Sequence, residues 1–174
     1  ELRDLMYTAQ LKPQGPFVIR YPRGRGVTVD WKQPFTELEI GKGQQLTKGT
    51  DIAILSLGPI GHQVSRAMSL LEKDHISAAH FDMRFLKPLD HDLLRQVFTR
   101  FDKIITVEDA SIAGGLGSAV LEFMSDRGYK ADVMRLGIPD RFVDHGTQEE
   151  LYHECGYDAE GIATTVRSMV LKKV

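Results

Sequence analysis

From Asp51 onward, the hydrophobic positions of the chain alternate between two spacings. Short apolar runs such as Ile52–Leu55 are typical of strands that are buried on both faces. Between these runs, apolar residues recur every three or four positions, as at Val64, Ala67 and Leu71, which predicts amphipathic helices. The pattern predicts strands within 51–57, 76–83, 103–109 and 131–137, and helices within 61–74, 91–101 and 117–128.

Two further helices are indicated by their caps. Thr147 and Glu150 form a T-x-x-E capping box that opens a short helix, and Asp158 precedes a helix that carries Ile162 and Val166. Strands that alternate with helices require crossover connections. We therefore expect an α/β fold with a mostly parallel sheet and helices on both of its faces.

The first fifty residues follow another pattern. Apolar residues from Leu2 to Ala9 have helical spacing, and the run Phe17–Ile19 predicts a buried strand. Such a strand needs sheet neighbours that the adjoining sequence does not offer. We therefore interpret residues 1–25 as the tail end of a preceding domain, and the chain as a piece of a longer protein.

Residues 26–50 are interpreted as a linker, because glycines and scattered polar residues separate the two regions. One alternating stretch, Glu37–Ile40, is compatible with an edge strand. Residues 51–174 then form the second domain.

The composition narrows the classes of function. The 174 residues carry 22 basic and 24 acidic side chains, a balance that argues against a nucleic-acid-binding or membrane-surface protein. No apolar run approaches the roughly 20 residues of a membrane helix. The single cysteine, Cys155, excludes an internal disulfide and fits a reducing compartment, so we expect a cytoplasmic location.

Glycines follow the third predicted strand, in the stretch EDASIAGGLGS from Glu108 to Ser118. A turn of this kind, where it opens a helix, can bind an anion through free N–H groups. Two observations favour close backbone packing instead. Val120 stands where a dinucleotide fingerprint requires glycine or alanine, and Glu108 and Asp109 would repel a phosphate.

Other titratable residues give weaker signals. Asp82 and Arg84 are two apart on a strand and hence on one face, which favours a structural ion pair. Glu149 and His153 have i,i+4 spacing but no third ligand nearby, which favours a surface pair over a metal site. The remaining candidates lack a neighbour that would make them reactive; they are His145 beside Asp144, Cys155, and the scattered histidines His62, His75, His80 and His91.

The densest positive charge lies in VIRYPRGRG, residues 18–26, which holds three arginines and no acid. Pro22 cannot continue a central strand, so the chain must turn near Tyr21. Arg20 and Arg23 would then lie at the carboxyl end of a strand, the edge where open α/β sheets bind ligands. A guanidinium group suits a phosphate. From the residues alone, a phosphate site and a solvated basic turn both remain open.

Several stretches resemble, in matching order, the 1-deoxy-D-xylulose-5-phosphate synthase family, whose members are similar to transketolase. They are GPFVIRYPRG, EIGKG, IAILSLGPIG, DMRFLKPLD, TVEDASIAGGLGSAVLEF, LGIPDRFVDHGTQEELY and GYDAEGI. DMRFLKPLD and LGIPDRFVDHGTQEEL are the most specific, and residues 24–36 match least. The chain resembles the C-terminal part of such an enzyme. The resemblance implies that residues 1–25 are the tail end of the pyrimidine-binding domain and that residues 51–174 are a transketolase-like C-terminal domain.

The resemblance implies a transferase that condenses pyruvate with D-glyceraldehyde 3-phosphate, with loss of carbon dioxide. It implies thiamine diphosphate and Mg²⁺ as cofactors, a homodimer, and a product used in isoprenoid, thiamine and pyridoxal synthesis. It also implies that Arg23 of the RYPRG motif helps to hold the phosphate of the aldehyde, while Arg20 and Tyr21 shape the turn.

The family's metal motif, Gly-Asp-Gly followed by an asparagine, does not occur in these 174 residues. We therefore expect that this chain alone binds no cofactor or metal, contains no catalytic residue, is inactive, and serves packing and dimerisation. Two alternatives remain open: the C-terminal domain of another thiamine enzyme, such as a dehydrogenase E1 β subunit, and a stand-alone module that binds a nucleotide at Gly114–Gly117.

Overall fold

The computed structural model describes residues 1–11, 15–22 and 32–171. The chain forms two compact units, Glu1–Ile40 and Gly41–Val174.

The first unit contains the predicted N-terminal helix, α1 (Leu2–Leu11). The Tyr7 ring stacks on Phe35 with 5.3 Å between centroids, and the Arg3 guanidinium lies 4.5 Å over the Phe35 ring. The buried Thr8 hydroxyl accepts a hydrogen bond from the backbone N–H of Leu38 at 2.8 Å. Aromatic stacking and one buried hydrogen bond therefore hold α1 to residues 35–38.

Two strands predicted in the first forty residues are wrong for this structure. Residues 15–22 have no regular structure, and Val18 is 88% exposed. Glu37–Ile40 is also not a strand, although Leu38 is buried. The physical reason is the same in both cases: no strand among the described residues pairs with either stretch, and an apolar run alone does not satisfy a strand's backbone groups.

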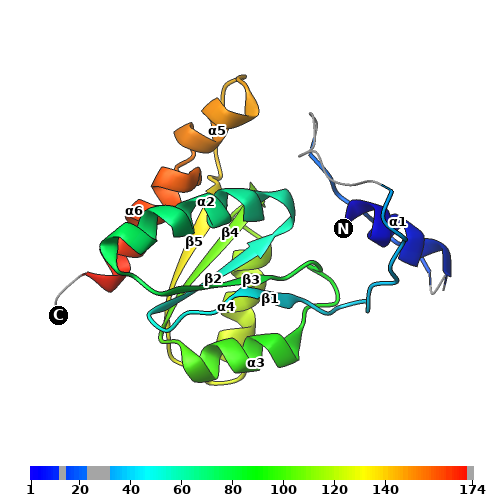
Figure 1. The fold of residues 1–174 in the computed structure, drawn as a ribbon, viewed down its shortest axis with the longest axis horizontal. Coiled ribbons are helices and arrows are strands. Elements are labelled where there is room, and N and C mark those ends of the chain that lie inside the picture. Colours follow the sequence, from blue (N-terminus) through cyan, green and yellow to red (C-terminus); the bar gives the residue numbers. More distant parts are fainter. Residues whose placement is uncertain (12–14, 23–31, 172–174) are drawn as a thin grey trace. The chain divides into compact units, whose positions relative to one another are not determined.

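The second unit is built on a five-stranded sheet with the order β1-β3-β2-β4-β5 (Figure 1). Strand β1 is antiparallel to β3, and all other neighbouring pairs are parallel. The strands are β1 (Gln44–Thr47), β2 (Ile52–Leu57), β3 (Ala78–Asp82), β4 (Lys103–Ser111) and β5 (Asp132–Ile138). The four predicted strands and the mostly parallel sheet are confirmed.

Helices cover both faces of this sheet, as predicted (Figure 1). Ile52 and Ile54 belong to a core with α2 and α6, whereas Ala53 and Leu55 belong to a core with α3 and α4. The helices are α2 (Gly61–Leu71), α3 (His91–Arg100), α4 (Leu116–Asp126), α5 (Gln148–Glu154) and α6 (Ala159–Val170). Within the described ranges, no helix has the length and apolar character needed to cross a membrane.

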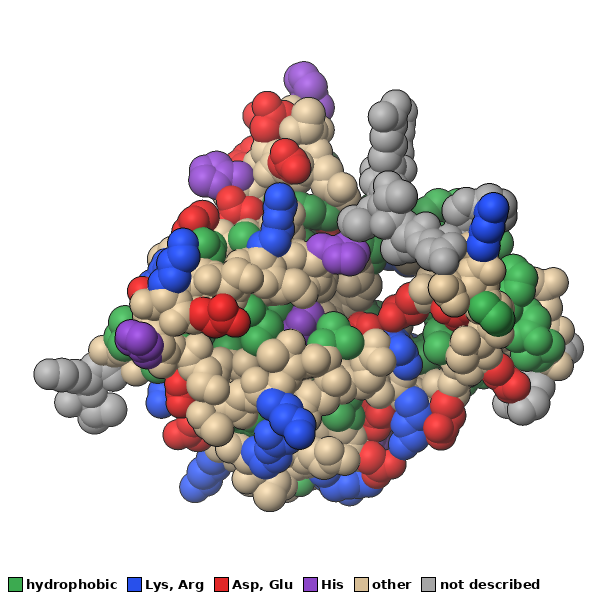
Figure 2. Space-filling view, viewed as in Figure 1, with side chains coloured by type: hydrophobic (Ala, Val, Ile, Leu, Met, Phe, Trp, Pro, Cys, Tyr) green, Lys and Arg blue, Asp and Glu red, His purple; other side chains and the backbone are tan. Residues whose placement is uncertain are grey.

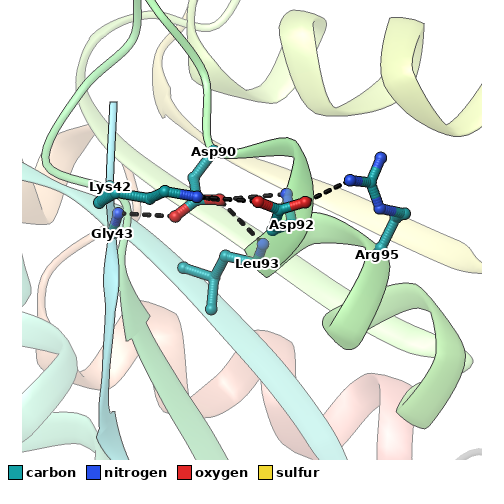
Figure 3. A network of polar contacts seen from close by, with 6 residues as sticks. All are labelled: Lys42, Gly43, Asp90, Asp92, Leu93 and Arg95. Carbon is teal, nitrogen blue, oxygen red and sulfur yellow. Dashed lines mark hydrogen bonds and ion pairs between the residues drawn. The ribbon is translucent and has the colours of Figure 1, made fainter. Parts of the chain in front are cut away.

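Strand β1 lies in the stretch that we expected to be a linker, and Asp90 holds it in place (Figure 3). The Asp90 carboxylate is buried and accepts a hydrogen bond from the backbone N–H of Gly43 at 3.0 Å. The same side chain caps α3 by accepting from the N–H groups of Asp92 and Leu93, at 3.1 and 3.0 Å. Residues from Gly41 onward are therefore part of the second unit rather than of a linker.

Candidate functional site

The glycine-rich turn between β4 and α4 is filled by the chain's own carboxylate. Glu108 is 1% exposed, and its two carboxylate oxygens accept hydrogen bonds from the N–H groups of Leu116 and Gly117, at 2.8 and 2.9 Å. A negative group at this position complements the positive end of the α4 dipole. A phosphate at this helix end would have to displace Glu108.

Two glycines allow this close approach. A Cβ atom on Gly115 would collide with the Glu108 carboxylate. A Cβ atom on Gly117 would lie 2.6 Å from Cδ of Arg135 and 2.8 Å from Oγ1 of Thr106. The prediction that these glycines serve close packing is therefore confirmed.

Arg135, on β5, closes the same turn from the side. Its guanidinium donates to the carbonyl of Ile112 at 2.7 Å and to the Ser118 hydroxyl at 3.2 Å. The Ser118 hydroxyl also accepts from the N–H of Gly114 at 2.9 Å. The donors of the turn thus point at protein acceptors, which argues against the alternative of a nucleotide at Gly114–Gly117.

The neighbouring carboxylate, Asp109, joins β4 to the C-terminal helices. One oxygen accepts from the Tyr152 hydroxyl and the other from the Tyr157 hydroxyl, both at 3.1 Å. Burial, together with Asp109, raises the pKa of Tyr157 well above its ordinary value, so this hydroxyl remains a donor. No pattern in the sequence indicates this contact, because both tyrosines lie more than forty residues beyond Asp109.

The sequence patterns also did not indicate a buried cluster formed by a serine, a histidine and an aspartate. The Ser56 hydroxyl lies 2.8 Å from Nε2 of His80, and both side chains are at most 1% exposed. Burial lowers the pKa of His80 to about 4, partly opposed by the nearby Asp82. Period-two alternation places His80 and Asp82 on one face, but it contains no information that β2 would bring Ser56 alongside.

These residue types occur in hydrolase triads, but the geometry does not support hydrolysis. Ser56 is fully buried, and a Cβ atom at Gly61 of α2 would lie 3.2 Å from its hydroxyl, so a substrate has no access. The Asp82 carboxylate accepts from the backbone N–H of Arg84 at 3.1 Å and pairs with its Nε at 3.8 Å. The predicted Asp82–Arg84 ion pair is thus confirmed, but Arg84 is not on the strand as expected: β3 ends at Asp82, and Arg84 has a φ of +54° in the segment that follows. The cluster is structural.

The remaining candidates form no reactive centre in the part of the chain that the structure describes. His153 pairs with Asp158 at 2.8 Å, and not with Glu149 as the i,i+4 spacing favoured. No group of three or more histidine, cysteine, aspartate or glutamate side chains within that part could hold a metal ion. Burial, together with Glu154, raises the pKa of the Cys155 thiol, which disfavours the thiolate.

The arginine cluster is only partly described. Arg23 lies outside the described residues. Arg20 and Tyr21 are exposed, Tyr21 to 68%, in a stretch without regular structure. The roles of Arg23, Arg20 and Tyr21 toward a phosphate therefore stay predictions.

Known proteins share this architecture. The family model for the transketolase C-terminal domain matches residues 41–162, nearly all of the second unit. A solved structure described as "Split gene transketolase, inactive beta4 tetramer" has a TM-score of 0.73 and 32% identity, over 80% of this chain and 45% of that one. A transketolase of Pichia stipitis, at 20% identity and a TM-score of 0.57, shares the fold.

Curated relatives extend the similarity along the whole chain. A 1-deoxy-D-xylulose-5-phosphate synthase of Cytophaga hutchinsonii is 60% identical over 97% of this chain, and one of Vibrio vulnificus is 44% identical over 99%. The chain spans about a quarter of the length of these relatives, 27% in both cases. By its matched domain and its fold, the chain belongs to the transketolase C-terminal domain family.

Proposed function

We propose that this chain is the C-terminal part of a longer 1-deoxy-D-xylulose-5-phosphate synthase. The observation that carries the proposal is 60% identity to a synthase of that name over 97% of the chain. The whole protein would join a two-carbon unit from pyruvate to D-glyceraldehyde 3-phosphate, with loss of carbon dioxide. Because the chain spans 27% of that relative, the activity is assigned to the whole protein and not to these residues alone.

The second unit would serve as a structural module in this enzyme. Its sheet edge, where related folds bind ligands, is closed by internal contacts of Glu108 and Asp109. Packing and homodimer formation are therefore the roles that we propose for it. A cytoplasmic location stays a prediction.

Thiamine diphosphate and Mg²⁺ would be held by other parts of the enzyme. The described residues offer neither a cluster of metal ligands nor an open N-terminus at α4 that fits a diphosphate. When bound, the cofactor would supply the carbanion chemistry that breaks the bond to carbon dioxide.

Arg23 would supply a contact to substrate from this chain. Its guanidinium, in the motif RYPRG, suits the phosphate of the aldehyde because it can hold two oxygens with parallel charge-assisted bonds. Arg20 and Tyr21 would shape the turn before it.

The reaction is tested by offering the longer protein three substrate pairs, in the presence of thiamine diphosphate and Mg²⁺. We expect product from pyruvate with D-glyceraldehyde 3-phosphate, and none from a ketose phosphate with an aldose phosphate or from pyruvate with lipoamide. Product only from the second pair would identify a transketolase, and product only from the third a dehydrogenase component. The 174-residue chain alone is expected to form no product.

A further inference from the structure

Among the described residues of the second unit, one large apolar side chain, that of Phe142, is fully exposed. Phe142 is 103% exposed, the highest exposure among the large hydrophobic side chains of the described residues. It belongs to the loop of residues 139–147, between β5 and α5, in which Val143 is only partly buried. A single exposed apolar residue is ordinary, so the surroundings of Phe142 decide what its exposure means.

The loop that carries Phe142 is fixed at both ends. At its start, the N–H of Arg141 donates to the carbonyl of Pro139 at 2.7 Å, and its guanidinium pairs with Glu154 of α5 at 3.3 Å. At its end, Thr147 and Glu150 form a capping box, with the Glu150 carboxylate 2.8 Å from the N–H of Thr147. Phe142 is thus presented from an anchored loop, which reduces the ordering entropy that a partner would have to overcome.

The surroundings of Phe142 are acidic. Helix α5 projects away from the sheet, and acidic side chains gather over this projection (Figures 1 and 2). Residues 139–154 contain five carboxylates and one arginine. Asp140, Asp144 and Glu149 are exposed and make no ion pair with a described residue. A complementary partner therefore needs an apolar pocket bordered by cationic groups.

We propose that the loop of residues 139–147 docks onto the part of the longer polypeptide that precedes this chain, with Phe142 as the buried anchor. This inference rests on the proposed function, because it requires that the chain be the C-terminal quarter of a longer protein. The length of the relatives argues for this occupant: nearly three quarters of such a protein lies outside this structure and is available to cover an exposed apolar side chain. Aromatic side chains in well-packed pockets, ringed by contacts that exclude water, supply much of the binding energy at protein interfaces.

The contact can be mapped directly in the longer protein. A photo-reactive phenylalanine analogue replaces Phe142, and because this side chain is exposed, the replacement should disturb the fold little. The matched control places the same analogue at Leu46, which is 48% exposed on β1, the opposite edge of the sheet from β5. After irradiation, mass spectrometry identifies the attached peptides.

We expect crosslinks from position 142 to residues that precede this chain, at about tenfold higher yield than from position 46. Crosslinks only within the same 174 residues, crosslinks to a second copy of them, or no crosslink above the control would each overturn the proposal. The result does not depend on turnover, so it is distinguishable from a failure of the proposed reaction.

A second variant tests whether the contact stabilises the loop. Phe142→Asp in the longer protein should increase hydrogen exchange over residues 139–154 about tenfold, while Leu46→Asp should leave that exchange unchanged. Equal exchange in wild type and Phe142→Asp would contradict the docking.

Discussion

The carboxylate of Glu108 lies 2.9 Å from the backbone nitrogen of Gly117, inside the glycine-rich turn that opens α4. The anion that this helix end attracts is thus part of the protein itself. These hydrogen bonds join the carboxyl-terminal part of β4 to the first turn of α4. They also explain why the glycines Gly115 and Gly117 occur without a ligand site.

Replacing Glu108 tests this arrangement. Glu108→Ala leaves two buried N–H groups without an acceptor, and we expect a loss of about 2–4 kcal/mol in the free energy of unfolding. Glu108→Gln keeps one acceptor oxygen, so its free energy of unfolding should fall by less. Urea denaturation measures both. A loss below about 0.5 kcal/mol for Glu108→Ala would mean that water or another group replaces the carboxylate.

The neighbouring glycines provide a matched pair. Gly115→Ala places a methyl group against the Glu108 carboxylate, and we expect a loss of about 2–4 kcal/mol through displacement of that buried group. Gly114→Ala meets nothing within 4 Å and is disfavoured only by its φ of +77°, so about 1 kcal/mol is expected. Thermal unfolding of the two variants should show this order, and the reverse order would contradict the packing role of Gly115.

His80 should make stability depend on pH. Its pKa is about 4 in the folded chain and about 6.5 when unfolded, so between these values the unfolded chain binds a proton that the folded chain does not. The contribution of His80 to the free energy of unfolding is therefore complete above pH 6.5. It is lost as the pH falls toward 4, by about 3 kcal/mol in total.

His80→Gln should flatten this part of the profile of unfolding free energy against pH, whereas His62→Gln, at an exposed position on α2, should leave it unchanged. A profile for His80→Gln that keeps the full slope would show that other groups cause it.

Removing the buried carboxylate of Asp90 should destabilise the fold more than removing the exposed carboxylate of Asp92. Asp90 is buried and serves both β1 and α3, so Asp90→Ala should cost about 1–3 kcal/mol. Hydrogen bonds from Lys42 and Arg95 lower the pKa of Asp92, but this carboxylate is exposed, and Asp92→Ala should not change stability measurably. Equal losses in guanidinium denaturation would contradict the assignment of Asp90 as the cap.

Most elements of the second unit could be predicted because each is specified by residues within its own segment. Buried strands of β-branched residues, helical spacing at Val64 and Ala67, and caps at Thr147 and Asp158 each specify an element without reference to distant residues. Strand β1 was missed because Gln44–Thr47 carries no apolar alternation; its place depends on pairing with β3 and on Asp90.

The contacts of the site could be predicted only in part. The packing role of the glycine turn followed from Glu108 and Val120 in the sequence itself. The Ser56–His80 pair and the two tyrosines on Asp109 depend on which strands become neighbours, and neither pattern nor spacing contains that information. The strand expected at Phe17–Ile19 failed for the same reason: its structure depends on partners outside the local sequence.

The most direct measurement is the formation of 1-deoxy-D-xylulose 5-phosphate by the longer protein, with each substrate titrated, for wild type, Arg23→Ala and the control Arg66→Ala on the exposed side of α2. We predict turnover by wild type and by the control. For Arg23→Ala, we predict a KM for D-glyceraldehyde 3-phosphate that rises at least about 30-fold, the equivalent of about 2 kcal/mol, with the KM for pyruvate within about twofold of wild type. Absence of this product from the wild-type protein, or equal losses for both substrates in Arg23→Ala, would contradict the proposed function or the phosphate role of Arg23, respectively.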